Sequence, residues 1–165
     1  MSTIAYSQVF RRLPADHTVH NLVGRVANDW AFVEHLLDEI IWQLAGHDAA
    51  TGACLTAQIM GAWPRMLTIT ALCTNRRLPE KVLNQIDDVG RKLRGVQDRR
   101  NRILHDPWYL EDASQQTQQY RAMPKDELVI GFQEVTEQYL LETLEKIERR
   151  ITMVNELKQA ITAAL

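Results

Sequence analysis

Apolar side chains recur at three- and four-residue steps over a long first segment of the chain, which predicts an amphipathic helix. The segment opens at about Asp16, a residue type that caps helix N-termini, and closes at about Ala45, before Gly46. Its spacing places the apolar residues on one side of the helix, so this side is expected to face the core. These residues are Leu22, Val23, Val26, Trp30, Val33, Leu36, Leu37, Ile40, Ile41 and Leu44.

Two further segments continue the helical pattern. Residues 51–74 carry few charges and are expected to be buried on most sides, with Pro64 kinking the helix or dividing it in two. Residues 79–106 open with Pro79 at a first helical position, and Pro107 ends them.

Residues 108–133 break this pattern, because short stretches with aromatic and β-branched residues alternate with polar and proline-containing breaks. They are expected to form a small hairpin or three short extended pieces. A final helix is predicted from about Gln133, and its apolar seam, close to a heptad, is expected to pack against the first helix. The sequence thus predicts one all-α domain over residues 1–165. This is an up-and-down bundle of four to five helices with a short β-hairpin-like excursion before the last helix.

Composition and charge narrow the class of protein. Of the 165 residues, 45% are hydrophobic and 24% are charged, which is typical of a globular protein. The formal net charge of −2 argues against a chain coated by nucleic acid, although a local basic patch remains compatible with it. Cys54 and Cys73 have no ligand-like spacing, so a reducing cytoplasm is the expected setting. No signal-peptide pattern and no apolar window of about 18 residues occurs, so no membrane association is expected.

Several candidate sites are weak. No glycine-rich phosphate loop occurs, and His17 and His20 have no further ligands arranged around them, so neither a metal nor another cofactor is expected. Glu34, Asp38 and Glu39 are interpreted as a solvated acidic face of the first helix. The tryptophans at positions 30, 42 and 63 fall on apolar faces and are interpreted as core.

The segment 91–106 differs from the rest of the chain, since it holds six basic residues against two acidic ones, a local net charge of +4. A solvated basic helix face explains the cations, because positive charge near a helix C-terminus interacts favourably with the helix dipole. It does not explain Asn101, a weaker helix former than Lys or Gln, or His105, which stands just before the helix ends. The six basic residues are Arg91, Lys92, Arg94, Arg99, Arg100 and Arg102.

The geometry of a helix relates these residues to one another. On a continuous helix Asn101 and His105 are neighbours on one face, whereas Arg100 lies about 140° around the axis from His105. Arg100 must therefore reach across, the helix must loosen before it ends, or the partners must come from two subunits. Trp108 and Tyr109 come directly after Pro107. They could stack a base beside the histidine or anchor the turn to the core.

The run Arg100-Asn101-x3-His105 resembles the R-x(4–6)-H motif of HEPN (higher eukaryotes and prokaryotes nucleotide-binding) domains, which are helical bundles with the motif late in a long helix. Arg99 also satisfies the spacing, and the choice of Arg100 rests on the polar residue that follows it. The resemblance implies a metal-independent endoribonuclease or RNA-directed effector of toxin–antitoxin or phage-defence type, working as a dimer with paired motifs at the interface. In that case His105 is the general acid or base, Arg100 the phosphate clamp and Asn101 an orienting hydrogen-bond group.

This interpretation names RNA and protein partners. A homodimer is expected, because the uncharged segment 51–74, the seam of the last helix, Gly90 and Gly95 offer more apolar surface than a monomer of this size readily hides. An antitoxin or another protein is a further candidate partner. The side chains expected to bind single-stranded RNA are those of Arg91, Lys92, Arg94, Arg99, Arg102, Trp108 and Tyr109.

Two alternatives stay open. One is a non-catalytic HEPN-like module that uses the same surface to bind nucleotide, RNA or a protein partner. The other is a purely structural bundle in which the motif is a helix C-terminus that carries polar residues without a functional role. Burial of His105 in intramolecular hydrogen bonds would favour the structural bundle, whereas motif residues in an accessible cleft between two subunits would favour a nucleic-acid role.

Overall fold

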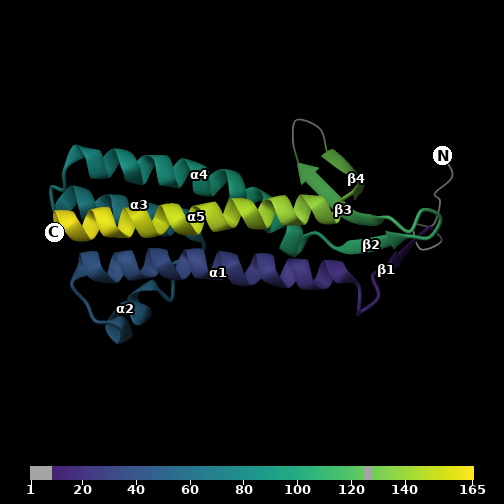
Figure 1. Cartoon of the computed structure of the whole chain (residues 1–165), viewed down its shortest axis with the longest axis horizontal. Helices are drawn as coiled ribbons and strands as arrows, with labels where there is room; N and C mark the ends of the chain where they lie inside the picture. The colour runs from purple at the N-terminus through teal and green to yellow at the C-terminus, as the bar shows by residue number, and fades with distance from the viewer. Residues whose placement is uncertain (1–8, 125–127) are drawn as a thin grey trace.

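The structure, a computed structural model, describes residues 9–124 and 128–165. Within these residues the chain is mostly helical with a small antiparallel sheet (Figure 1). The helices are α1 (Thr18–Ala45), α2 (Ala49–Thr56), α3 (Ala62–Asn75), α4 (Glu80–His105) and α5 (Glu137–Ala164). The strands are β1 (Phe10–Arg12), β2 (Trp108–Glu111), β3 (Thr117–Pro124) and β4 (Leu128–Glu134).

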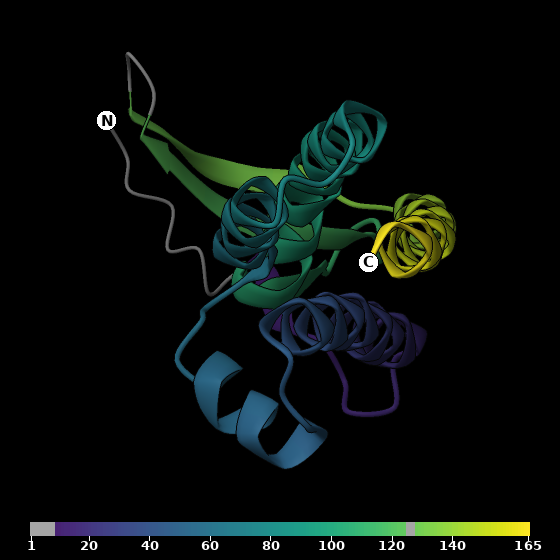
Figure 2. The same cartoon turned by 90° about the vertical axis from the view of Figure 1, so that its left-hand side faces the viewer.

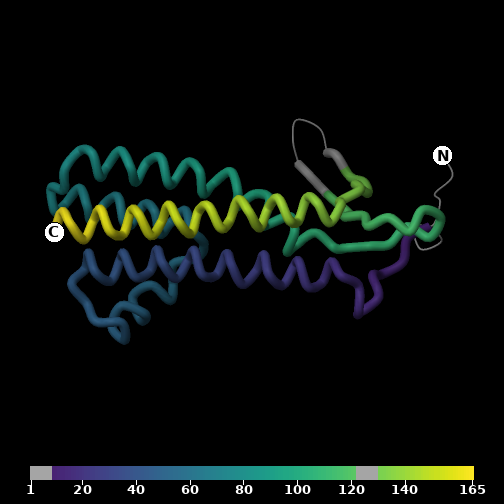
Figure 3. The backbone as a smooth tube through the Cα atoms, viewed as in Figure 1, coloured from purple at the N-terminus to yellow at the C-terminus, as the bar shows by residue number. Residues whose placement is uncertain are grey.

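Four of the helices run side by side along the long axis of the molecule (Figures 1 and 3). Helix α1 packs against α3 and α5, and α4 packs against the same two helices. The expected packing of the last helix on the first is therefore confirmed. The short helix α2 packs on α1 alone and lies outside the four-helix group (Figure 2).

The boundaries of α1 follow its sequence closely. Its N-cap is His17, whose side chain accepts a hydrogen bond from the backbone N–H of Val19 at 3.3 Å, so the cap lies one residue after the predicted Asp16. At the other end Gly46 adopts a left-handed conformation with φ 72°, which glycine tolerates because it has no Cβ.

The uncharged stretch is divided into two helices, as predicted, but not at Pro64. The break covers residues 57–61, and Pro64 lies in the first turn of α3, where its missing N–H would have no intrahelical partner in any case. Asp48 is the N-cap of α2, and its carboxylate accepts hydrogen bonds from the backbone N–H groups of Ala50 at 2.9 Å and Thr51 at 3.0 Å.

Two other predicted starts shift. Pro79 is the N-cap of α4 and not its first helical residue. Helix α5 starts at Glu137, after the cap Thr136, because the residues around Gln133 belong to strand β4. At these residues the pairing of β4 with β3 favours an extended strand, although the sequence pattern predicts a helix.

The extended region forms more sheet than the predicted hairpin. The four strands are all antiparallel in the order β1-β2-β3-β4, and the edge strand β1 comes from the N-terminal part of the chain, with Arg12 opposite Tyr109. The sheet lies at the end of the bundle where α1 starts, α4 ends and α5 starts (Figure 1). A three-residue strand carries too little alternation to be recognised in the sequence.

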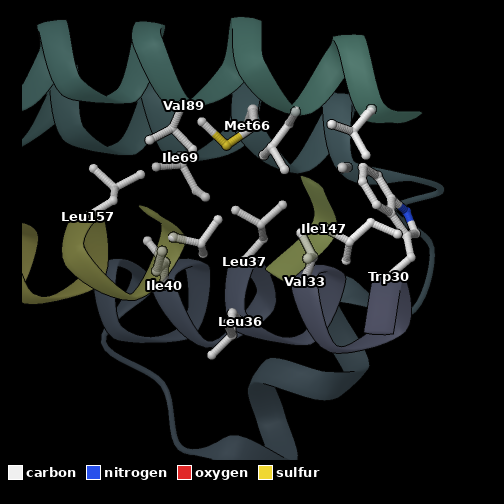
Figure 4. Packing of buried hydrophobic residues seen from close by; sticks show 14 of the residues in the cluster. Trp30, Val33, Leu36, Leu37, Ile40, Met66, Ile69, Val89, Ile147 and Leu157 are labelled. Carbon is white, nitrogen blue, oxygen red and sulfur yellow. The ribbon is translucent and has the colours of Figure 1, made fainter. Parts of the chain in front are cut away.

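The core lies between the four long helices. Figure 4 shows Val33, Leu37 and Ile40 of α1 pointing toward Ile69 of α3 and Val89 of α4, with side chains of α5 closing the space. All of these residues are buried, as the apolar stripe of the first helix predicts. No helix among the described residues is both long and apolar enough to cross a bilayer.

Candidate functional site

The sequence motif lies in the last two turns of α4, beyond the point where α3 begins. A Cβ atom placed on Gly61, just before α3, would lie 3.8 Å from Nε2 of Gln97, so α3 starts level with Gln97. The remaining turns of α4 extend past α3 toward the sheet.

Side chains of the sheet hold this end of α4. The indole Nε1 of Trp108 donates a hydrogen bond to the backbone carbonyl of Ile103 at 2.9 Å. The buried Gln119 of β3 donates from Nε2 to the carbonyl of Arg102 at 3.2 Å. The carbonyl of Ile103 has no backbone donor four residues on, since residue 107 is proline, whereas that of Arg102 also accepts from the backbone N–H of Asp106 at 3.0 Å. Both side-chain contacts fix the position of the motif.

Arg100 occupies a position in the apolar stripe of α4. The stripe advances in alternating steps of four and three residues, and the position that Arg100 fills is the one charged place in it. Its buried members are Val82, Ile86, Val89, Leu93, Val96 and Ile103. The guanidinium is half-buried, and its Nε is buried without a hydrogen-bond partner among the residues that the structure describes.

The partner of Arg100 is its neighbour in the sequence. Nη1 of Arg100 donates to Oδ1 of Asn101 at 3.0 Å. This bond joins adjacent residues of the helix, one of which belongs to the apolar stripe. The structure therefore brings together the arginine and the polar residue of the predicted site.

His105, the last residue of α4, is exposed. Its imidazole has no hydrogen bond and no ion pair with any other described residue. The arrangement that would favour a purely structural bundle, a histidine buried in intramolecular hydrogen bonds, is not found. An exposed imidazole is free to exchange protons with a bound molecule.

A single copy of the chain does not bring Arg100 and His105 to the same place. Helix α4 is continuous through His105 and does not loosen. The two residues therefore lie about 140° apart around its axis, while Asn101 and His105 differ by about 40°.

Arg99 is held by α5. Its guanidinium lies 4.2 Å from the ring centre of Tyr139, and Nη2 lies 3.7 Å from a carboxylate oxygen of Glu142. Both residues belong to α5. These contacts occupy Arg99, so Arg100 is the better candidate for the motif arginine.

The other cations near the motif do not share one face. Arg91 and Lys92 pair with Asp88 at 3.1 and 2.7 Å, and Arg102 lies 3.6 Å from Asp106. Arg94 turns toward α3. Pairs of this kind on a surface leave the cations accessible to phosphate, and the RNA-binding role of these residues stays a prediction.

Arg94 lies 4.3 Å above the ring of Trp63, which is 37% exposed. The prediction that Trp63 belongs to the core is therefore wrong. The same prediction for Trp30 is confirmed, since Trp30 is 1% exposed. Trp63 covers Gly90, where an added Cβ would lie 3.7 Å from its ring, so this glycine serves close packing within the chain.

The two aromatic residues after α4 point to opposite faces of the sheet, as successive residues of a strand do. Trp108 packs against the core, so its hydrogen bond to the end of α4 anchors the turn. Tyr109 packs its ring edge-on against Phe132 at 5.3 Å between ring centres.

A network of an ion pair and hydrogen bonds around Asp106, the residue after His105, was not predicted from the sequence. Asp106 lies 3.7 Å from Nε of Arg121. Nη2 of Arg121 donates to Oε1 of Gln119 at 3.0 Å, and its Nη1 donates to Oε1 of Gln133. The network depends on the strand register that places β3 against the end of α4, and no local spacing in the sequence indicates that register.

The acidic residues of α1 are also not all solvated, contrary to the prediction. Arg65 of α3 binds both oxygens of Asp38, at 2.7 and 3.1 Å, and its side chain is 10% exposed. Glu34 lies 3.9 Å from the same guanidinium and accepts a hydrogen bond from Nε1 of Trp30 at 2.7 Å. This cluster ties α1 to α3. Among the described residues no group of His, Cys, Asp and Glu side chains is arranged to hold a metal ion.

Comparisons of the chain with the models of known protein families, with curated proteins and with solved structures give no match. Any family assignment thus rests on the motif in α4 and on the helical bundle that carries it.

Proposed function

We propose that this protein is a metal-independent endoribonuclease of toxin–antitoxin or phage-defence type, with a HEPN-like active site shared by two copies of the chain. The observation that carries the proposal is the contrast at the end of α4. His105 is exposed and has no partner among the described residues, while Arg100 places a charged group in an apolar stripe and bonds to Asn101. Packing of the helix end requires neither feature.

The chemistry of RNA cleavage without a metal needs these groups. A base takes the proton from the 2′-hydroxyl, O2′ attacks the phosphorus, the bond to O5′ breaks, and an acid gives O5′ a proton. The products are a 2′,3′-cyclic phosphate and a 5′-hydroxyl. Positive charge near the non-bridging oxygens stabilises the transition state, which is the role proposed for Arg100.

One copy offers a single motif histidine, which cannot be base and acid in the same step. Within one copy Arg100 also lies on a different side of α4 from His105. A two-fold dimer with the ends of both α4 helices near the axis supplies a second histidine and a second arginine. We therefore expect a homodimer at micromolar concentration, measurable by sedimentation equilibrium. A monomer under these conditions would contradict the shared site.

The test is cleavage of single-stranded RNA by the purified protein in EDTA. We expect activity to survive EDTA, to leave a 2′,3′-cyclic phosphate and to need a 2′-hydroxyl on the 5′ side of the cut. His105→Ala should reduce the rate by about 10²- to 10⁴-fold. The matched control is His47→Ala, since His47 is also exposed but lies after α1, and it should leave the rate unchanged.

A second candidate function is a non-catalytic module that binds nucleotide, RNA or a protein partner on the same surface. The angular separation of Arg100 and His105 within one copy favours it. If wild-type protein and His105→Ala are equally inactive on varied RNAs while both still bind RNA, the binding module is correct and the endoribonuclease is not.

A further inference from the structure

A hollow of about 450 Å³ opens beside the end of α4, between the sheet and the start of α1. Arg12, Leu13, His20, Pro107, Trp108 and Tyr109 line it. Most of this lining is apolar or aromatic, and two polar groups stand in it. Such a combination is typical of sites that bind a flat organic group and orient it by a few polar contacts.

The two polar groups keep bonding capacity that no residue in 9–124 or 128–165 uses. Arg12 has no ion pair or hydrogen bond with the described part of the chain, whereas its neighbour Arg11 lies 3.0 Å from Asp112 and donates to Gln115 at 3.0 Å. Nε2 of His20 lies 3.0 Å from the carbonyl of Pro14. A carbonyl only accepts, so Nε2 donates this bond, and in the tautomer with one proton on Nε2 the Nδ1 atom is an acceptor.

The floor of the hollow is held in place. The indole of Trp108 is oriented by its bond to the carbonyl of Ile103. Arg12 is the last residue of β1 and Trp108 the first of β2, so the hollow lies where these two strands end, and Arg12 and Trp108 line it although their side chains leave opposite faces of the sheet. The side chains of the hollow are held by these contacts, so binding requires little ordering of the protein.

The hollow lies next to the proposed active site. Pro107 is two residues after His105, so their Cα atoms are at most about 7.6 Å apart. A base held against Pro107 therefore belongs to a nucleotide whose phosphate is within reach of the imidazole of His105.

We propose that this hollow binds the nucleobase of the RNA nucleotide next to the scissile phosphate, with the base against Trp108 and Pro107, His20 Nδ1 accepting from the base edge and Arg12 holding a phosphate. The assignment to RNA rests on the proposed function. The site itself does not, because a nucleotide can occupy it whether or not the phosphate is cleaved.

The test uses the full chain labelled with ¹⁵N and carrying His105→Ala, so that no cleavage occurs. The indole N–H signal of Trp108, assigned by its loss in Trp108→Phe, reports on the hollow, and the signal of Trp63 is the internal control. Nucleoside monophosphates, ribose 5-phosphate and hexauridylate are titrated in turn. We expect nucleoside monophosphates to shift the Trp108 signal saturably, with a Kd at least about 10-fold below that of ribose 5-phosphate.

Adjacent variants on opposite faces of β1 then locate the phosphate. Arg12→Ala should weaken nucleotide binding about 10-fold or more, and Arg11→Ala should leave it unchanged. Equal affinity for ribose 5-phosphate, equal effects of the two variants, or a shift at Trp63 alone would overturn the site. Failure of hexauridylate to shift the Trp108 signal would overturn the assignment to RNA. If the site binds as expected but wild-type protein does not cleave, the endoribonuclease fails and the nucleobase site stands.

Discussion

Arg100 donates a hydrogen bond of 3.0 Å to the side chain of Asn101, although the spacing of α4 assigns Arg100 to the helix face that packs inward. Every other position of that stripe from Val82 to Ile103 is apolar and buried. A charge at such a position costs stability unless it is fully paired, and the Nε of Arg100 has no partner among the described residues. A residue that opposes folding in this way is a candidate for selection by function.

Replacing Arg100 by methionine should therefore separate stability from function. We expect the free energy of unfolding of Arg100→Met to stay the same or to rise by about 1 kcal/mol, because an apolar side chain completes the stripe. RNA cleavage should be lost, since the transition-state charge has no partner. Urea unfolding and the cleavage assay measure the two effects. A loss of more than about 2 kcal/mol would assign Arg100 a structural role and support the purely structural bundle.

The pair formed by Arg65 and Asp38 should be far more important for stability than any exposed ion pair. Removing one partner leaves the other charge buried, so Asp38→Ala should lower the free energy of unfolding by about 3 kcal/mol. The control is Glu145→Ala, whose partner Arg149 lies 3.8 Å away and is 73% exposed, and it should change stability by less than about 0.5 kcal/mol. Similar losses for both variants would contradict the burial of the pair.

The thiol of Cys73 should make stability fall at alkaline pH. Burial raises the pKa of Cys73 from 9.0 to about 11, while Arg76 nearby lowers it only in part. Above pH 9 the unfolded chain loses this proton and the folded chain keeps it, so the contribution to stability is complete below pH 9 and declines until about pH 11. Urea unfolding of wild type and Cys73→Ala across this range measures the difference. A parallel pH dependence of the two proteins would contradict it.

Native labelling gives an independent check on the same thiol. Cys54 is exposed and Cys73 is buried. A thiol reagent at pH 8 should therefore modify Cys54 at once and Cys73 only after unfolding, because thiolate character and access both control the reaction. Rapid modification of both cysteines in the folded protein would show that Cys73 is accessible.

The long helices are predictable from the sequence because their signals are local. The stripe of α1 and the left-handed stop at Gly46 follow from spacing and from a single residue, whereas the uncharged stretch is divided at residues 57–61 and not at Pro64. The residues of the candidate site can be singled out in the same way, since Arg100, Asn101 and His105 lie within six residues of one helix, and their role stays a prediction.

What the sequence does not predict depends on contacts between distant segments. Strand β1 is recognisable only once Arg12 is paired with Tyr109, and the hollow beside it requires both segments. The acidic face of α1 is misjudged because the partner of Asp38 is on α3. The pattern within one helix indicates which side is apolar. It does not indicate which charged residue of another helix will pair with a charged residue of the first.

Glycines at two helical positions should respond oppositely to the same substitution. At Gly52 in α2 an added Cβ would lie 2.3 to 2.8 Å from ring atoms of Trp42, whose indole is held by a hydrogen bond to Thr56 at 3.1 Å. Gly52→Ala should therefore destabilise the protein by about 1–3 kcal/mol, because either the ring or the helix must move. At Gly24 in α1 no atom lies within 4 Å of an added Cβ. Gly24→Ala should stabilise the protein by about 0.5–1 kcal/mol, since alanine is the better helix former. Thermal and urea unfolding measure both variants, and the tryptophan fluorescence of the folded protein should change only in Gly52→Ala, because only that substitution contacts a tryptophan ring. If Gly52→Ala were neutral, α2 would not be packed against α1 as tightly as the structure indicates.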